Sequence, residues 1–155
     1  MRRLGLFIAT CGYIGYAPVA PGTFGSAVGL AVFAAVRTSE SHAIEAAAII
    51  VLFLVGVWSG TEAEHHFGGI DPAPVVMDEV VGMLITLAFL PVTWVGALVG
   101  FLVFRLFDVV KPWPAARFER LPGGLGVMAD DGMAAVYSNL VMHGLIALAP
   151  VGWLV

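Results

Sequence analysis

Residues 80–104 read VVGMLITLAFLPVTWVGALVGFLVF, a run of 25 residues without any Asp, Glu, Lys or Arg. A helix that crosses the core of a bilayer takes about 20 apolar residues. Pro91 lies near the middle of the run and lacks the amide hydrogen that a helix interior needs. The run therefore predicts either one tilted span or a hairpin that turns at residues 90–94, with arms of about 16–24 Å at ~1.5 Å per residue.

The rest of the chain also has too few charges for an ordinary soluble domain. Of its 155 residues 60% are hydrophobic and 12% are charged, against about 25% charged in an average soluble domain. Residues 4–36, 46–60 and 132–155 are uncharged as well. This pattern indicates an integral membrane protein with one domain over residues 1–155. The net charge of −4 excludes a basic surface for nucleic acid.

We expect an all-α fold, a small polytopic membrane domain of short and broken helices. The expected order is a short helix from about Gly25, a helix over residues 43–60, a broken pair around Pro91 and a last helix from about Gly132. The Gly- and Pro-rich stretches are expected to be loops; they cover residues 15–26, 68–74 and 111–126.

The distribution of basic residues predicts the orientation. Residues 105–131 hold four of the seven Lys and Arg residues, which places this segment in the cytoplasm. Residues 61–79 hold five acidic residues and no basic one, so this segment has no preference of its own. A hairpin at Pro91 would bring both segments to the cytoplasmic face, and only then could their acidic groups share one site.

The stretch APVAPGTFGS, residues 17–26, leads directly into an apolar run. Its glycines allow a close approach of the backbone, and the amides of a helix start favour an anion such as phosphate. An ordinary helix cap formed by Thr23 or Ser26 is the other interpretation.

Three acidic groups flank apolar runs. Asp78 and Glu79 come where the run of residues 80–104 begins, and Asp130 and Asp131 follow a glycine-rich turn. Asp108 lies three residues from both Arg105 and Lys111, a spacing that puts all three on one helix face. Carboxylates beside basic residues and a phosphate-binding helix start are typical of metal-assisted phosphoryl chemistry, and Mg²⁺ prefers such hard oxygen ligands. Each group alone is equally compatible with a solvated helix end.

Taken together, these residues resemble the phosphatidylglycerophosphatase A family of bacterial membrane lipid phosphatases. The matching segments are GYIGYAPVAPGTFGS, TEAEHHFGGIDPAPVVMDEVVGM, FRLFDVVKPWP and PGGLGVMADD, in the family's order and over nearly the whole chain. The resemblance implies a Mg²⁺-dependent hydrolysis of phosphatidylglycerophosphate to phosphatidylglycerol and inorganic phosphate, in glycerophospholipid biosynthesis. It also implies a multi-pass protein of the bacterial inner membrane with its site facing the cytoplasm.

The resemblance further implies the roles of individual residues. The implied metal ligands, which are also catalytic groups, are Asp78, Glu79, Asp108, Asp130 and Asp131. Lys111 is implied to be both catalytic and substrate-binding, and the other implied substrate-binding residues are Pro21, Gly22, Thr23, Gly25, Ser26 and Arg105. Glu64 and Asp71 match the same pattern more loosely. The nucleophile, a water or a carboxylate, and the oligomeric state are left open.

A small membrane transporter or ion pathway is the alternative from another class, because carboxylates at the ends of spans can also line an ion path. A transporter would spread its charges through the middle of the membrane, whereas here they lie at the ends of the apolar runs.

Overall fold

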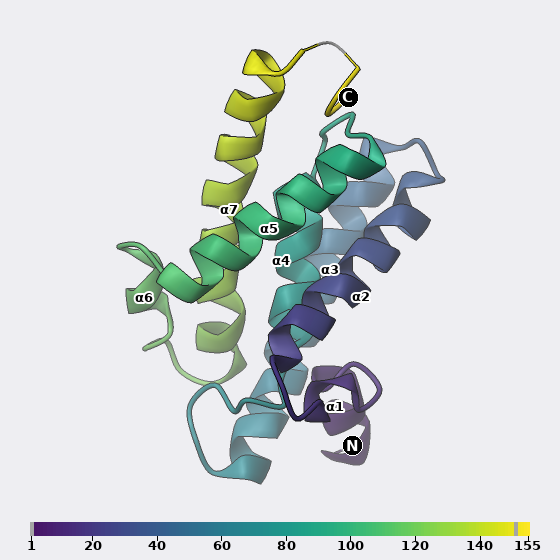
Figure 1. The fold of residues 1–155 in the computed structure, drawn as a ribbon. Helices are drawn as coiled ribbons and strands as arrows, with labels where there is room; N and C mark the ends of the chain where they lie inside the picture. Colours follow the sequence, from purple (N-terminus) through teal and green to yellow (C-terminus); the bar gives the residue numbers. More distant parts are fainter. Residues whose placement is uncertain (1, 151) are drawn as a thin grey trace.

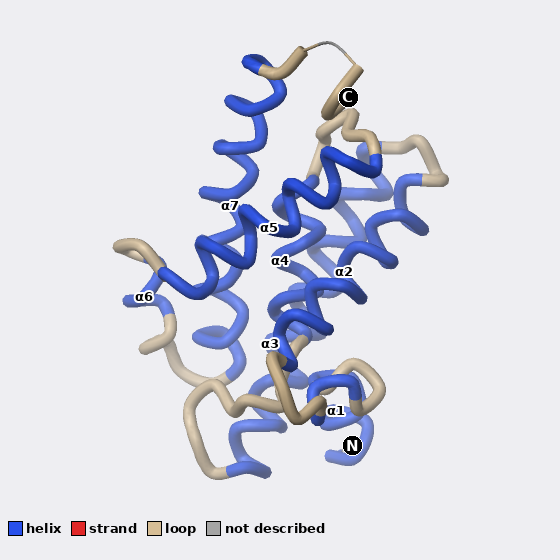
Figure 2. The backbone as a smooth tube through the Cα atoms, in the orientation of Figure 1, coloured by secondary structure: helices blue, strands red, loops and turns tan. Residues whose placement is uncertain are grey.

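A computed structural model describes residues 2–150 and 152–155 of the chain, and no strand occurs among them. The predicted all-α class is confirmed. Figures 1 and 2 show these residues as helices joined by loops that gather at the two ends of the molecule. The helices are α1 (Arg2–Ala9), the 3-10 helix η1 (Ile14–Tyr16), α2 (Pro21–Arg37), α3 (His42–Phe67), α4 (Met77–Leu87), α5 (Trp94–Val110), α6 (Ala115–Phe118) and α7 (Gly124–Leu148).

The short helix α4 lies in the middle of the fold. Nine of its 11 residues are buried, and it packs against α2, α3, α5 and α7. At ~1.5 Å per residue it is about 16 Å long, too short to cross a bilayer core by itself. It is stable because the longer helices enclose it and cover its apolar side chains, including Met83, Leu84 and Leu87.

Glycines let the neighbouring helices approach α4 closely. A Cβ at Gly82 would lie 2.3 Å from the Phe104 ring on α5, and one at Gly29 on α2 would lie 2.6 Å from the Met83 Cβ. Both distances are shorter than any real carbon contact, so a larger residue would push the helices apart.

The predicted hairpin is confirmed. Helix α4 ends at Leu87 and α5 begins at Trp94, with Pro91 in the connection between them. Thr93 caps α5 by accepting a hydrogen bond from the Gly96 amide, 3.2 Å away. The start of α4 and the end of α5 therefore lie on the same side of the molecule, and in Figure 1 α5 runs obliquely down toward α6.

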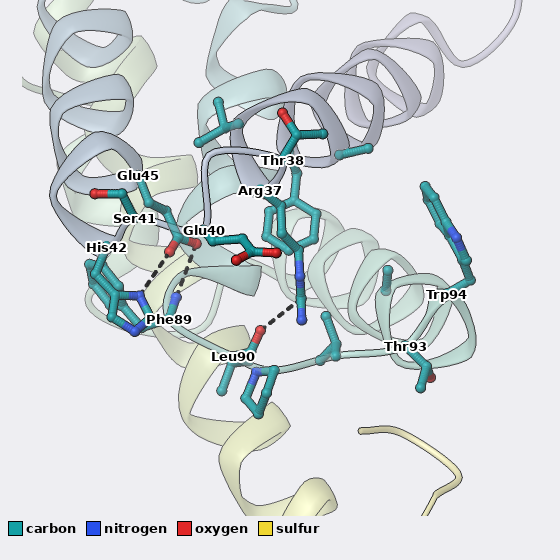
Figure 3. A pocket seen from close by; sticks show the side chains of 16 residues that line it. Arg37, Thr38, Glu40, Ser41, His42, Glu45, Phe89, Leu90, Thr93 and Trp94 are labelled. Atoms are coloured by element: carbon teal, nitrogen blue, oxygen red, sulfur yellow. Dashed lines mark hydrogen bonds and ion pairs between the residues drawn. The ribbon is translucent and has the colours of Figure 1, made fainter.

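Polar side chains of other helices hold the hairpin turn in place at the opposite end. Glu45 accepts a hydrogen bond from the Phe89 amide at 3.1 Å, and Arg37 donates to the Leu90 carbonyl oxygen at 2.9 Å. Figure 3 shows both contacts at the edge of a cavity of about 730 Å³. This cavity is larger than the one described in the next section, but Arg37 and Glu45 in its lining bind the hairpin turn, and it contains none of the predicted site residues.

Helix α3 is, among the described residues, the one helix that is both long and apolar enough to cross a membrane, and only 17% of its most apolar window is buried. Helix α5 carries Leu98, Leu102 and Leu106 at intervals of four residues, each more than half exposed. Apolar side chains in such an uncovered stripe are typical of a surface that faces lipid.

The boundaries of three helices differ from those expected. Helix α2 begins at Pro21, four residues before Gly25, and α3 continues to Phe67 instead of ending near residue 60. Helix α7 begins at Gly124 and not near Gly132. The stretches of residues 15–26 and 111–126 are therefore partly helical, and the predicted order lacked the short helices α1 and α6.

Candidate active site

Three carboxylates meet where the N-terminal turn of α4 faces α7. Asp78, Glu79 and Asp131 each place an oxygen within 4.8 Å of the oxygens of the other two. Asp78 and Asp131 are 6% and 2% exposed. Two of the oxygens, Oδ1 of Asp78 and Oε2 of Glu79, are buried without a hydrogen-bond partner.

Burying carboxylate oxygens without partners is costly, and an arrangement of this kind is stable when a cation neutralises it. The ligands are hard oxygens from three side chains, and no Cys or His takes part in the group. That chemistry suits Mg²⁺ better than Zn²⁺ or Cu²⁺. Asp78, Glu79 and Asp131 could therefore hold a magnesium ion.

Arg105 joins this group from α5. Its guanidinium forms an ion pair with Asp108 one turn further along, and its Nη1 lies 3.8 Å from Oε1 of Glu79. The same nitrogen donates to the Ser26 hydroxyl at 3.4 Å, and Ser26 donates in turn to the Gly22 carbonyl oxygen at 2.9 Å. This chain of contacts fixes Arg105 beside the carboxylates.

Lys111 faces the carboxylates from the end of α5. It has φ of 43°, in the left-handed region, so the chain leaves the helix here and the side chain turns toward α7. Its ammonium pairs with Asp130 and lies 4.0 Å from Asp71 and 4.0 Å from Asp131. Arg105, Asp108 and Lys111 were expected on one helix face, but only Arg105 and Asp108 share it and pair, because the helix ends before Lys111.

The surroundings of Lys111 keep it charged. Burial by itself lowers the pKa of the Lys111 ammonium, but the hydrogen bond to Asp130 and the charges of Asp130, Asp131 and Asp71 outweigh it and raise the pKa. Asp71 lies in the loop before α4, where burial, with the nearby charge of Asp130, raises the pKa of its carboxyl to about 6 against the opposing charge of Lys111. The site thus places a cation beside a carboxyl group whose pKa is raised to about 6.

The start of α2 forms the remaining wall. A Cβ at Gly22 would lie 2.1 Å from Oε1 of Glu79 and 2.9 Å from Nη1 of Arg105, so this position accepts no side chain. Pro21 is the first residue of α2, after Ala20. Ser26 lies in the second turn and bonds back to Gly22, so the prediction that Thr23 or Ser26 caps the helix is wrong.

A cavity of about 370 Å³ lies between these walls. The structure brings most of the predicted site residues to its lining: Pro21, Gly22, Asp78, Glu79, Arg105, Asp108, Lys111 and Asp131. The other predicted residues are placed differently. Asp130 forms an ion pair with Lys111, and Ser26 accepts a hydrogen bond from Arg105. Gly25 packs against Val76. Thr23 is exposed and does not line the cavity.

Asp71 also lines the cavity, although the predicted catalytic set does not include it. Its amide donates to Glu64 of α3 at 3.4 Å, which links the two residues that match the family pattern more loosely. Asp130 and Asp131 were expected at a helix start, but α7 begins six residues before Asp130, so the dipole of the helix start does not explain them.

Comparisons with known proteins identify the family of the chain. The family model described as Phosphatidylglycerophosphatase A matches residues 7–146, which include every residue of the cavity wall. The chain belongs to the phosphatidylglycerophosphatase A family. It is therefore a phosphatase, and the alternative of a transporter falls away.

Three relatives cover most of the chain. The phosphatidylglycerophosphatase A of Escherichia coli is 35% identical over 133 residues, 83% of this chain and 76% of the relative. That of Haemophilus influenzae is 34% identical over 128 residues, 81% and 78% of the two chains. A Bacteroides thetaiotaomicron protein, provisionally named a phosphatidylinositol-3-phosphatase, is 35% identical over 135 residues, 83% and 84%. No solved structure matches this member of the phosphatidylglycerophosphatase A family.

Proposed function

We propose that this phosphatase hydrolyses phosphatidylglycerophosphate to phosphatidylglycerol and inorganic phosphate, as a step of glycerophospholipid biosynthesis. The observation that carries the proposal is the cavity in which Asp78, Glu79 and Asp131 face Arg105 and Lys111. The names of the family and of two relatives supply the lipid. In the reaction a water attacks phosphorus, or a carboxylate attacks first and water then hydrolyses the acyl phosphate and restores the carboxylate. In either route the bond from phosphorus to the glycerol oxygen breaks, that oxygen takes up a proton, and the attacking water loses one.

We further propose that Mg²⁺ is the cofactor, held by Asp78, Glu79 and Asp131, with Asp108 and Asp130 around them. The two partnerless buried oxygens support this assignment. A bound Mg²⁺ would neutralise charge on the phosphate and offset the repulsion between that dianion and the carboxylates.

The chain's own cations bind and orient the phosphate. Lys111 and Arg105 face the cavity from one side and donate to the non-bridging oxygens. The absence of a side chain at Gly22 leaves room for Glu79 and Arg105 at the cavity wall. Because charge on those oxygens changes during phosphoryl transfer, fixed donors stabilise the transition state. Asp130 is a positioning residue, since it holds Lys111 through their ion pair.

The location is proposed to be the bacterial inner membrane, with several crossings and the site at the cytoplasmic face. Successive long helices run in alternating directions, so the starts of α2, α4 and α7 lie at the same end as the ends of α3 and α5 (Figure 1). Six of the seven basic residues belong to this end, and Arg37 belongs to the other. By the positive-inside rule, this distribution supports a site at the cytoplasmic face.

The substrate is tested by phosphate release from three lipids in mixed micelles: phosphatidylglycerophosphate, phosphatidylinositol 3-phosphate and phosphatidic acid. The proposal expects phosphatidylglycerophosphate to have by far the highest kcat/KM. The Asp131→Asn variant serves as the inactive reference, and Glu40→Gln, an exposed change at the far end, as the matched control. A higher kcat/KM for phosphatidylinositol 3-phosphate, in line with the name of the Bacteroides relative, would overturn the substrate assignment.

A further inference from the structure

The N-terminal segment leaves a group of large apolar side chains uncovered beside the site. We call Leu4, Phe7, Tyr13, Tyr16 and Val19 the N-terminal patch; their exposed fractions lie between 47% and 73%. All five belong to α1, to η1 or to the turns that follow these helices. Their uncovered surface needs a partner, because large exposed apolar patches mark interaction surfaces.

The rings of the patch form a continuous surface. The ring of Phe7 is 5.4 Å from that of Tyr13, Tyr13 is 6.1 Å from Tyr16, and Tyr16 is 6.3 Å from Phe67 at the end of α3. Tyrosines combine an apolar ring with a polar tip, which is why they gather where a membrane meets water.

Basic residues lie at one end of the same segment. Arg2 and Arg3 are exposed, and neither forms an ion pair with a carboxylate of the residues that the structure describes. The Arg2 guanidinium forms a hydrogen bond with the ring of His66 at 3.2 Å. These free charges complement the phosphates of anionic lipids.

The segment is attached firmly to the site. The carbonyl oxygen of Ala9 accepts a hydrogen bond from the Val76 amide at 2.9 Å, two residues before Asp78. A Cβ at Gly15 would lie 1.9 Å from the Pro74 carbonyl oxygen, so the turn around η1 packs directly on the loop that leads into α4. In Figure 2 the two loops run close together at the lower end. The position of the patch relative to any surface that it contacts therefore also fixes the position of the carboxylates at the start of α4.

We propose that α1 and η1 form an interfacial anchor, with the N-terminal patch inserted at the boundary between headgroups and acyl chains of a bilayer that contains anionic phospholipid. Helix α1 has a buried side, formed by Gly5 and Ala9 against α3, and an apolar exposed side. It is seen nearly end-on in Figure 1 while α3, α4 and α7 run up the page, as fits a helix that lies in the plane of the interface.

A bilayer is favoured over a second copy of the chain because the patch lies where α3, the helix apolar enough to span a membrane, passes into a polar end. Tyr16 packs against Phe67, the last residue of α3, which follows Glu62, Glu64 and His66. An apolar patch beside such a polar helix end fits the boundary between headgroups and acyl chains. The catalytic part of the inference, that the anchor sets the height at which a lipid phosphate meets the site, rests on the proposed function. The membrane contact itself does not.

The contact is tested with nitroxide labels at Tyr13→Cys and Val19→Cys in a Cys11→Ala background, in vesicles of phosphatidylcholine and phosphatidylglycerol. The exposed positions Gly69→Cys and Ala116→Cys are the controls. We expect the labels at positions 13 and 19 to be more accessible to oxygen, which dissolves in the bilayer, than to a water-soluble nickel chelate. The labels at positions 69 and 116 should be more accessible to the nickel chelate than to oxygen. Equal nickel access at all four positions would overturn the anchor, as would spin–spin broadening at 13 and 19 that grows with protein concentration and so reveals a second copy.

The catalytic part is tested with the double variant Phe7→Ser/Tyr13→Ser. In vesicles its apparent KM for long-chain phosphatidylglycerophosphate should rise roughly tenfold or more, while kcat on a water-soluble short-chain form should be unchanged. Leu121→Ser, an apolar residue at the same end outside the patch, should change neither. An unchanged KM in vesicles would overturn this part. The labelling experiment does not depend on activity. A parent protein that is inactive on this lipid would contradict the proposed function, and the labelling result would still decide whether the anchor exists.

Discussion

Glu79 occupies the space that a side chain at Gly22 would need: a Cβ there would lie 2.1 Å from its Oε1. The start of α2 and the start of α4 are thus fitted to one another at the wall of the cavity. Arg105 fills the other side of the same gap, with its Nη1 2.9 Å from that Cβ position. The Glu79 carboxylate and the Arg105 guanidinium can both take these positions only because residue 22 has no side chain.

We therefore predict that Gly22→Ala lowers kcat/KM for the lipid phosphate by about 100-fold, because it displaces Glu79 and Arg105 by an ångström or more. Gly22→Val should act more strongly and raise KM as well. The control is Gly69→Ala, where an added Cβ has nothing within 4 Å. Parent-like rates for both Gly22 variants would place the phosphate pocket elsewhere.

Lys111 is predicted to act on the transition state more than on binding. Lys111→Ala should lower kcat about 100- to 1,000-fold with a smaller change in KM, since a charged donor to the phosphate is lost. Steady-state rates in mixed micelles measure both constants. Arg120→Ala removes an exposed positive charge at the same end and should leave kcat near the parent value; equal losses in the two variants would contradict a specific role for Lys111.

Asp71 should make the metal-free protein less stable as the pH rises. Its pKa is about 6 in the folded chain against 3.8 normally, so the folded state binds the proton more tightly than the unfolded state. The resulting stability is present below pH ~4 and is lost as the pH rises through about 6, by at most about 3 kcal/mol at ~1.4 kcal/mol per pKa unit.

In excess chelator, the Tm of the parent relative to Asp71→Asn should therefore fall between about pH 4 and pH 7. The exposed variant Glu40→Gln provides the reference for effects at a distance from the site. If the Tm of the parent relative to Asp71→Asn stayed constant or rose with pH, Asp71 would not be buried beside Asp130 and Lys111 as described.

The two ends of the molecule should lie on opposite sides of the membrane. In a Cys11→Ala background, a cysteine at Ala73 or Ala116 should react only with a reagent that reaches the cytoplasm, and one at Ser39 only with a reagent outside. Labelling of Ala73 and Ala116 from opposite sides is incompatible with the hairpin, and labelling of both from outside would reverse the proposed orientation.

Part of the fold could be predicted because its signals are local. Pro91 cannot continue a helix, and the turn forms around it. Asp78 and Glu79 lie in the first helical turn of α4, and Arg105 pairs with Asp108 as their spacing of three residues predicts.

Other features depend on contacts between distant segments. Helix α3 continues through Glu62, Glu64 and His66, because a helix that leaves the apolar region needs no apolar residues. Gly124 reads as a turn in the sequence, yet it lies within α7, where its missing side chain lets the helix approach the Val57 carbonyl oxygen of α3. Lys111 finds Asp130 only because α5 and α7 meet, and spacing along the chain contains no such information.

The central claim is that Asp78, Glu79 and Asp131 form a Mg²⁺ site on which the phosphatase depends. The most direct measurement is phosphate release from phosphatidylglycerophosphate as Mg²⁺ is added back to the parent protein and to Asp131→Asn, both first depleted of metal with a chelator. The Tm of each protein shows that it is folded. We expect no release in excess chelator, recovery of the parent's activity with Mg²⁺, and rates lower by orders of magnitude for Asp131→Asn at every Mg²⁺ concentration. Full activity of the parent in excess chelator, or parent-like recovery of Asp131→Asn, would contradict it.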